Sequence, residues 1–340
     1  MGEIWCPNPL EHVTVVDNGD VHLCQCPWIA PVGNVLQSSP WDLWNSLAAQ
    51  DMRSAAHGGN FGKYCSRCPL VPGPRGFIVD AERPLLARQA PARIGQLKLD
   101  YDRTCRLACG TCRRGVTVVD RELVTKIQEV VVNSGLLKRS DSLYVTGAGD
   151  PFDSPSLFSL LRSLPNLVDP LLPPRVILHT HGLSLAEKWS QLGETTSFVK
   201  EIRVTVDEAL TPGETSQDCG LVNRGGRYES LVNNLYFAGG LGPNVVLRLY
   251  YVVQANNFEG MKRALDLAKR VGAASIDFFP LENWGTYQTL DYLVRAVHHS
   301  KHPRHLELLA VLREVRTMDT AGLSGGTIFQ LDELKGSVKP

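Results

Sequence analysis

The stretch that decides the fold is Leu99-Asp-Tyr-Asp-Arg-Thr-Cys-Arg-Leu-Ala-Cys-Gly-Thr-Cys-Arg-Arg-Gly115. Its three cysteines, Cys105, Cys109 and Cys112, are spaced C-x3-C-x2-C and follow a strand-like run from Ile94 to Asp102. Three thiolates can bind three irons of a [4Fe–4S] cluster and leave the fourth iron without a protein ligand. A structural zinc site would need a fourth nearby Cys or His, and none follows at the usual spacing. The motif therefore predicts an iron–sulfur centre with one open, reactive position.

The composition indicates a globular protein without strongly charged partners. The chain has 340 residues, of which 43% are hydrophobic and 21% charged, and its formal net charge is +0. This balance argues against a nucleic-acid partner. No apolar run approaches the roughly 18–20 residues of a membrane span, and the start shows no signal segment. We therefore expect a cytoplasmic protein without membrane partners, and nine cysteines in such a protein indicate metal binding rather than disulfides.

Between residues 94 and 317, short β-branched runs alternate with helical stretches, which is the pattern of repeated β–α units. The predicted strands are Leu97–Asp102, Ser142–Thr146, Arg175–Thr180, Glu201–Asp207, Val245–Val253 and Ser275–Pro280. The predicted helices are Asp120–Ser134, Ser156–Leu164, Leu185–Gln191, Arg227–Ala238, Phe258–Val271 and Arg304–Thr317. The sequence therefore predicts an α/β fold built around parallel strands.

The cysteine motif, on a loop between a strand and a helix, resembles that of the radical S-adenosylmethionine (SAM) superfamily. In that family SAM chelates the open iron through its amino and carboxylate groups, and the core is a partial (β/α)6 barrel of the TIM type. The resemblance implies this fold for the core, with the chemistry at the C-terminal ends of the strands. It also implies two cofactors, SAM and a [4Fe–4S] cluster bound by Cys105, Cys109 and Cys112.

The segment after the second strand resembles a SAM-binding motif of that family. Val145-Thr-Gly-Ala-Gly-Asp-Pro151 is similar to the glycine–glycine–acid motif that receives the ammonium group of SAM. Glycines allow close approach of the backbone, and a carboxylate accepts hydrogen bonds from a cation. The resemblance therefore implies that SAM is bound by Gly147, Gly149 and Asp150.

Further positions follow from the same resemblance. The fourth strand ends in Val204-Thr-Val-Asp207, similar to the family's Val-Ser-Xaa-Asp strand, which implies that Thr205 contacts the ribose or methionyl part of SAM. The later segment Asn223-Arg-Gly-Gly226 is similar to an Arg-x-Gly-Gly segment of the family and implies that Arg224 contacts the cofactor. In the turn after the third strand, His181 stands where the family's Thr-Asn-Gly turn has Asn.

A second cysteine set precedes the core. Together with a hairpin turn at Asp17-Asn-Gly19 and a Trp-bearing segment at Pro40–Asn45, it resembles a SPASM-type auxiliary cluster domain. Cys26 is an alternative ligand to Cys24, and a zinc ribbon with the same four thiolates is an alternative to the cluster. The cysteines that the resemblance implies as ligands of an auxiliary [4Fe–4S] cluster are Cys6, Cys24, Cys65 and Cys68.

These assignments divide the chain into four parts. We expect a SPASM-like domain at residues 1–70, a linker at 71–93, a radical SAM core at 94–317 and a C-terminal tail at 318–340.

The resemblance implies a radical SAM enzyme that cleaves SAM reductively to a 5′-deoxyadenosyl radical. The radical would abstract a hydrogen atom from a small polar metabolite of sugar or aminocyclitol type, as in antibiotic biosynthesis. The auxiliary cluster would then help to oxidise it, with flavodoxin or ferredoxin as electron donor. Three alternatives remain open at this point. They are a redox-neutral epimerase in which Cys219 is the catalytic hydrogen-atom donor, an enzyme that modifies a ribosomal peptide, and a non-enzymatic iron–sulfur electron-transfer protein.

Overall fold

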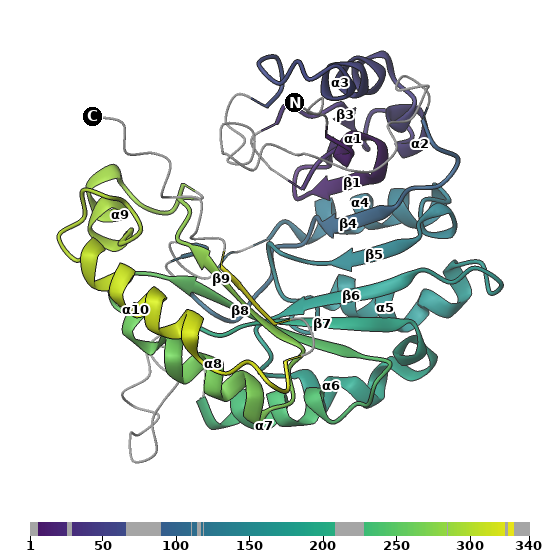
Figure 1. Cartoon of the computed structure of the whole chain (residues 1–340). Helices are drawn as coiled ribbons and strands as arrows, with labels where there is room; N and C mark the ends of the chain where they lie inside the picture. The colour runs from purple at the N-terminus through teal and green to yellow at the C-terminus, as the bar shows by residue number, and fades with distance from the viewer. Residues whose placement is uncertain are drawn as a thin grey trace. The chain divides into compact units, whose positions relative to one another are not determined.

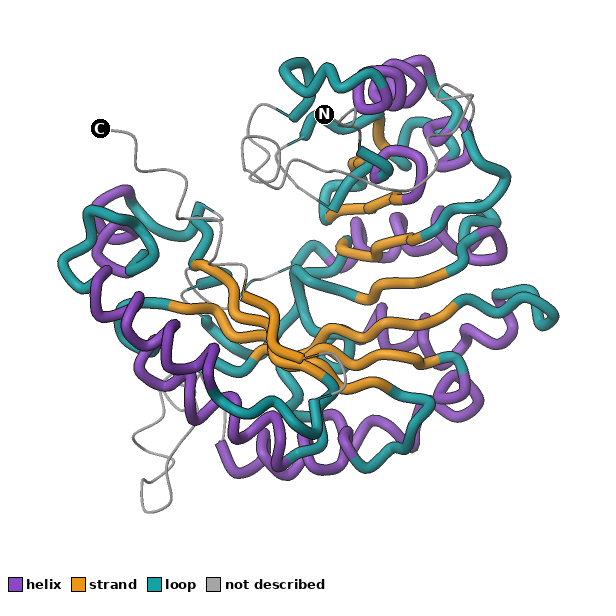
Figure 2. The backbone as a smooth tube through the Cα atoms, viewed as in Figure 1, coloured by secondary structure: helices purple, strands orange, loops and turns teal. Residues whose placement is uncertain are grey.

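The computed structural model describes residues 6–25, 29–65, 90–109, 111–113, 117, 119–207, 228–283, 285–323 and 326–329, and Figure 2 draws the others in grey. The helices, labelled in Figure 1, are α1 (Asn8–Glu11), α2 (Pro40–Trp44), α3 (Leu47–His57), α4 (Arg121–Asn133), α5 (Pro155–Leu167), α6 (Leu185–Trp189), α7 (Tyr228–Gly239), α8 (Met261–Arg270), α9 (Thr289–Arg295) and α10 (His305–Thr317). The strands are β1 (His12–Val16), β2 (Asp20–His22), β3 (Gly33–Asn34), β4 (Gln96–Asp100), β5 (Ser142–Val145), β6 (Arg175–Thr180), β7 (Val199–Thr205), β8 (Val246–Val253), β9 (Ser275–Pro280) and β10 (Gly326–Phe329).

The strand order is β10-β9-β8-β7-β6-β5-β4-β1-β2-β3, so the sheet is mostly parallel and has two open edges. The chain divides into two compact units, and β6 contributes residues to both. The first unit comprises Met1–Arg103, Val119–Ile177 and Glu194–Phe198, and the second comprises Thr104–Val118, Leu178–Gly193 and Val199–Pro340.

In the first unit, the N-terminal cysteine-rich segment is part of the same sheet as the core. Strand β1 pairs in parallel with β4, with His12 opposite Gln96, and β4 pairs in parallel with β5. Strands β2 and β3 continue from β1 as antiparallel neighbours. The side chain of Gln25 also donates from Nε2 to Oε1 of Gln96, at 2.7 Å. The first core strand therefore receives backbone hydrogen bonds from the N-terminal segment on one edge and from β5 on the other.

The N-terminal segment is held together by a buried arginine. Arg53 on α3 donates from Nε to the carbonyl of Pro9, at 2.9 Å, and from Nη2 to the carbonyl of Trp44, at 2.7 Å. Its guanidinium also lies 4.1 Å from the centre of the Trp44 ring. Burial lowers the pKa of this guanidinium to about 10. The paired carbonyls and the indole face compensate for that burial, so one side chain joins all three N-terminal helices.

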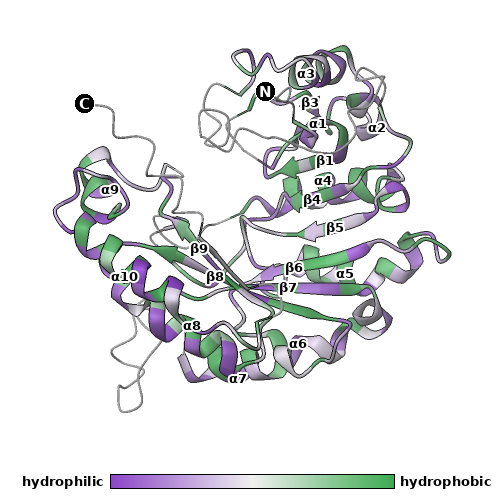
Figure 3. Cartoon of the chain, viewed as in Figure 1, coloured by the Kyte–Doolittle hydropathy of each residue, from purple (hydrophilic) through white to green (hydrophobic). Residues whose placement is uncertain are grey.

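In the second unit, β7, β8, β9 and β10 are parallel neighbours. Helices α7 and α8 pack on this sheet, with α10 against α8 (Figure 1). Both α8 and α10 carry hydrophobic and hydrophilic residues (Figure 3), as expected for helices that cover a sheet and face solvent. On β8, Leu247, Leu249 and Tyr251 are buried, and the hydroxyl of Tyr251 lies at the start of α8, next to Gly260. The alternate residues of β8 therefore lie on the opposite face of the sheet.

The predicted fold class, an α/β core with repeated parallel β–α units, is confirmed. The six strands and six helices expected between residues 94 and 317 all occur, and their bounds agree to within three residues. Strand β10 lies within the predicted C-terminal tail and pairs with β9, so this part of the tail is a further parallel strand. Among the described helices, none is both long enough and apolar enough to cross a membrane.

One close backbone approach in the second unit gives a test of this packing. A Cβ atom at Gly239, the last residue of α7, would lie 1.7 Å from the carbonyl oxygen of Val271. Because this neighbour is backbone and cannot rotate away, we expect Gly239→Ala to lower the free energy of unfolding by about 3 kcal/mol. Urea unfolding measures this change. Gly62→Ala is the matched control, since its Cβ would meet no atom within 4 Å. Equal stability of the two variants would contradict the helix packing described here.

Candidate functional site

The three cysteines of the C-x3-C-x2-C motif lie on the loop after β4. The carbonyl of Cys109 accepts hydrogen bonds from the backbone N–H groups of Cys112 and Arg113, each at 2.9 Å. This turn places Cys109 and Cys112 on one short bend of the chain. The backbone N–H of Leu107 donates to Sγ of Cys105, at 3.4 Å. Such a hydrogen bond stabilises a sulfur that carries negative charge.

A buried guanidinium lies beside the last cysteine of this loop. Arg113 is 5% exposed, and its Nη2 donates to Sγ of Cys112, at 3.5 Å. Burial by itself lowers the pKa of Arg113, but the negative charges of Cys112, Cys105 and Cys109 raise it above its ordinary value on balance. All three thiolates therefore act on one cation. Three cysteine sulfurs on one loop are a soft donor set that fits three irons of a [4Fe–4S] cluster.

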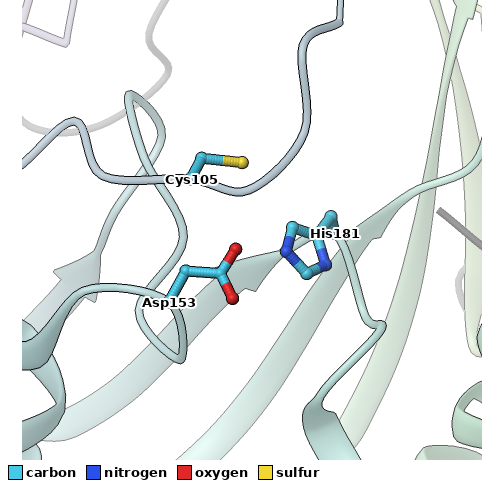
Figure 4. A group of neighbouring side chains, drawn as sticks. All are labelled: Cys105, Asp153 and His181. Atoms are coloured by element: carbon cyan, nitrogen blue, oxygen red, sulfur yellow. The ribbon is translucent and has the colours of Figure 1, made fainter. Parts of the chain in front are cut away.

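The turn after β6 lies beside the cysteine loop in the second unit. Gly182 has a φ of +80° there, and a Cβ atom at this residue would approach Val204 and Leu231 to 3.0 Å. The adjacent His181 accepts a hydrogen bond at Nδ1 from the backbone N–H of Leu183, at 3.0 Å. A ring nitrogen of His181 and Sγ of Cys105 lie within 4.8 Å of each other. Figure 4 shows both side chains.

The third side chain drawn in Figure 4 is that of Asp153, a residue of the first unit.

The glycine-rich turn after β5 is fixed by a carboxylate from β4. Oδ1 of Asp100 accepts hydrogen bonds from the backbone N–H groups of Gly147, at 2.7 Å, and Ala148, at 3.1 Å, and from the hydroxyl of Thr146, at 3.2 Å. Its other oxygen, Oδ2, lies 2.6 Å from Nζ of Lys98. Both partners of this ion pair are largely buried. Asp100 therefore sets the conformation of the turn that the sequence predicts to bind SAM.

The acidic residue of that turn has hydrogen-bond partners within its own segment. Asp150 is buried, and its Oδ1 accepts from the backbone N–H groups of Phe152, at 2.9 Å, and Asp153, at 3.3 Å. Next to it, Ser154 caps α5 and donates its hydroxyl to Oδ2 of the buried Asp102, at 2.5 Å. The predicted residues Gly147, Gly149 and Asp150 thus lie on one turn whose ends are both fixed.

A row of polar side chains occupies the face of β7, β8 and β9 that points away from α7 and α8. Thr205, predicted to contact SAM, is joined by a hydrogen bond between its Oγ1 and Nε2 of His179, at 3.1 Å. Thr205 is opposite Tyr250 in the sheet register, and Tyr250 is opposite Asp277. The ring of Tyr250 lies 5.4 Å from that of His179 and 4.9 Å from that of Phe279. This face therefore combines hydroxyl, imidazole and aromatic groups near the C-terminal ends of the strands.

Charged residues lie one register step below this row. Oε1 of Glu201 forms ion pairs with Nε of Arg203, at 2.5 Å, and with Nε of Arg248, at 3.3 Å. Arg248 also donates to the hydroxyl of Ser275, at 3.0 Å.

Asp277, 6% exposed, is the second carboxyl of this face. Its pKa is raised by burial, against the opposing effect of Arg248. Within the described part of the chain, Oδ1 of Asp277 has no hydrogen-bond partner. The face thus carries a buried acceptor that can take a further donor.

The loop after β8 supports this end of the sheet. The side-chain amide of Asn257 donates to the carbonyls of Asp207, at 3.0 Å, and Val252, at 2.9 Å, and its Oδ1 accepts from the N–H of Gln254, at 2.7 Å. One side chain therefore joins the chain after β7 to the chain after β8.

The predicted auxiliary ligands lie around α1, β2 and α3. Cys6 is buried, and its backbone N–H donates to the carbonyl of Ala56 at the end of α3. Sγ of the buried Cys24 accepts from Nδ2 of Asn8, at 3.6 Å. Cys65 is half-buried. These residues remain predicted ligands.

Several predicted positions lie outside the described residues, namely Cys26, Cys68, Cys219 and Arg224.

Three residues near these sites were not predicted from the sequence: Asp100, Arg113 and Asp277. Lys98 and Asp100 alternate with the buried Leu97 and Leu99 on β4, which is the pattern that could have indicated a polar face. The signal for Asp277 is the same alternation, with apolar residues of β9 on either side. The signal for Arg113 is only its position directly after Cys112.

The hydrogen bonds of Asp100 give a test of its role in the turn. Asp100→Ala removes a buried acceptor and leaves Lys98 without this partner, so we expect the free energy of unfolding to fall by about 3 kcal/mol. Hydrogen exchange at the amides of Gly147 and Ala148 should also become faster. Asp120→Ala is the control, since it removes only the N-cap of α4 and should cost about 1 kcal/mol. Unchanged exchange at Gly147 and Ala148 in Asp100→Ala would contradict the assignment.

Comparison with known proteins gives one family match and several structural likenesses. Among solved structures, the chain is similar to Streptococcus suis SuiB bound to precursor peptide SuiA, at 13% sequence identity and a TM-score of 0.39, over 82% of this chain and 53% of that one. It is also similar to TYW1 with a lysine-pyruvate adduct bound, at 14% identity and a TM-score of 0.38, over 66% and 72% of the two chains. A third is the radical SAM methyltransferase TsrM from Kitasatospora setae, at 14% identity and a TM-score of 0.33, over 52% and 35%.

The chain thus spans about half the length of SuiB. No sequence among the curated proteins matches it. Residues 6–69 match the family model of SPASM, an iron–sulfur cluster-binding domain. This match agrees with the SPASM-like domain that the sequence predicts at residues 1–70. Residues 6–69 of this chain are thus similar to the SPASM iron–sulfur cluster-binding domains.

Proposed function

We propose that this chain is a radical SAM enzyme that cleaves SAM reductively and oxidises a small polar metabolite, of sugar or aminocyclitol type, with the help of the auxiliary cluster. The observation that carries the proposal is the C-x3-C-x2-C loop directly after a parallel strand, in which the buried guanidinium of Arg113 donates to Sγ of Cys112. When bound, the open [4Fe–4S] cluster supplies one electron to SAM, and SAM supplies the radical that abstracts hydrogen. The protein contributes binding, orientation and exclusion of water.

The turn after β5 supports a role in binding SAM. Asp100 orders the backbone N–H groups of Gly147 and Ala148, and this leaves little conformational entropy to be lost when a ligand contacts the turn. Gly147 and Gly149 have no side chain to obstruct such an approach. We assign Asp100 as the residue that positions this turn.

The polar face of the second unit supports a polar substrate. Its charged groups are balanced, with two arginines, Arg203 and Arg248, facing two carboxyls, Glu201 and Asp277. A balanced face of donors and acceptors suits a neutral or amino-bearing polyol better than a strongly charged ligand. The aromatic rings of this face, with Tyr250 among them, suit the apolar side of a sugar-like ring.

Oxidation of the substrate also needs a group that accepts a proton. After hydrogen abstraction, the substrate radical loses one electron, which we assign to the auxiliary cluster, and one proton. Glu282 lies two residues after the C-terminal end of β9 and is half-buried. Burial raises the pKa of its carboxyl, which makes the carboxylate a stronger base. We therefore assign Glu282 as the candidate proton acceptor.

The first test of the function concerns the open cluster. Cys105→Ala removes one of three cluster ligands, so we expect reductive cleavage of SAM to 5′-deoxyadenosine to be lost. Anaerobically reconstituted protein, dithionite and SAM are sufficient for this measurement, which does not require the substrate. Cys65→Ala is the matched control, because it changes a cysteine of the N-terminal module and should still cleave SAM. Formation of 5′-deoxyadenosine by Cys105→Ala would disprove the proposal.

The second test concerns the auxiliary cluster. We expect about eight irons per chain in the reconstituted protein, from two four-iron clusters, and about four in Cys65→Ala. Iron and sulfide analysis measures both. One zinc and about four irons in the unmodified protein would contradict the auxiliary cluster as electron acceptor. The redox-neutral reaction, with Cys219 as hydrogen-atom donor, would then be favoured, and uptake of solvent deuterium into the product would identify it.

A further inference from the structure

The guanidinium of Arg113 is placed where its charge acts on the cysteine loop. It is almost completely removed from solvent, and Nη2 lies 3.5 Å from Sγ of Cys112. On its other side, Nη1 lies 3.5 Å from the hydroxyl of Thr117, which is a neutral partner. Burying a charge is costly unless nearby groups compensate for it. The thiolates of the loop are such groups, so the positive charge of Arg113 and the negative charge of the loop stabilise each other.

Reduction of the cluster adds negative charge beside Arg113. A [4Fe–4S] cluster with three thiolate ligands is negative overall, and one-electron reduction makes it more negative. The reduction potential of such a cluster depends on its net charge, on hydrogen bonds to its sulfurs and on its exposure to solvent. A fixed cation acts strongly at short distance inside a protein, where the dielectric constant is low. A buried arginine beside a ligand sulfur therefore stabilises the reduced cluster more than the oxidised one.

We propose that the charge of Arg113 raises the reduction potential of the cluster bound by Cys105, Cys109 and Cys112, so that a biological donor can reduce it. The inference rests on the proposed function, and Arg113 acts in it through the cluster rather than on the substrate. One electron passes from a low-potential donor, a reduced flavin or dithionite, to the cluster. The donor loses that electron, and no covalent bond forms or breaks.

The test is a redox titration of the reconstituted full chain, followed by EPR spectroscopy of the reduced open cluster. The signal that changes on addition of SAM is followed, because this separates the open cluster from the auxiliary one. For Arg113→Gln, we expect the ratio of reduced to oxidised cluster at a fixed potential to fall about tenfold, a shift of about 59 mV for one electron. Arg113→Lys keeps the charge and should remain near the unmodified protein.

The control is Arg270→Gln, which makes the same change of charge at an exposed residue at the end of α8. It should leave the potential unchanged. An unshifted potential in Arg113→Gln would overturn the inference, and so would equal shifts in Arg113→Gln and Arg113→Lys, because the effect would then come from shape and not from charge.

If Arg113→Gln does not bind the open cluster, its potential cannot be measured, and the iron content of further variants is compared instead. Arg113→Met is then prepared as a second neutral variant. Loss of the cluster in both neutral variants, with normal iron content in Arg113→Lys, would support the need for a positive charge. Loss in all three variants would overturn it. Failure of the proposed function looks different, because the unmodified protein would then show no SAM-sensitive EPR signal at all.

Discussion

The carboxylate of Asp100 is the group on which the arrangement of the first unit depends. It ends β4, and it accepts from the hydroxyl of Thr146 and from two backbone N–H groups of the turn after β5 while paired with Lys98. A largely buried carboxylate is tolerated only when such partners satisfy it. The strand that carries it leads directly into the cysteine loop and pairs with β1 on its other edge. One satisfied charge thus connects the end of a strand with a glycine-rich turn, just before the cysteine loop begins.

Polar groups on the sheet recur in the second unit, where they are balanced in pairs. Glu201 forms ion pairs with two arginines, Arg203 and Arg248. Asp277 lies near Arg248, and its Oδ1 has no hydrogen-bond partner among the described residues. Placing such groups on a sheet costs free energy unless partners satisfy them. The helices contact the other face, where Leu247, Leu249 and their neighbours form the core. The apolar core and these polar groups therefore occupy opposite faces of the same strands.

Much of the fold could be predicted because periodicity within a segment is local information. All six predicted core strands occur, as does the SPASM region at residues 6–69. The pairing of β1 with β4 could not be predicted, since β1 reads as a strand of a local hairpin and nothing in its sequence names a distant neighbour. Strand β10 was missed because only four residues near the end of the chain form it. The roles of Asp100 and Arg113 depend on contacts that appear only once the loops are folded. Cys219 and Arg224 remain predictions from sequence.

The parallel pairing of β1 with β4 has a consequence for biosynthesis. Residues 12–16 leave the ribosome long before residues 96–100, so β1 can form its hairpin with β2 early but must wait for its second neighbour. Until then, one edge of β1 offers unpaired backbone groups to other chains. If the N-terminal segment is removed from the chain, β4 in turn has one edge whose backbone groups are unpaired. A core without this module would therefore need another way to protect the edge of β4 that β1 covers.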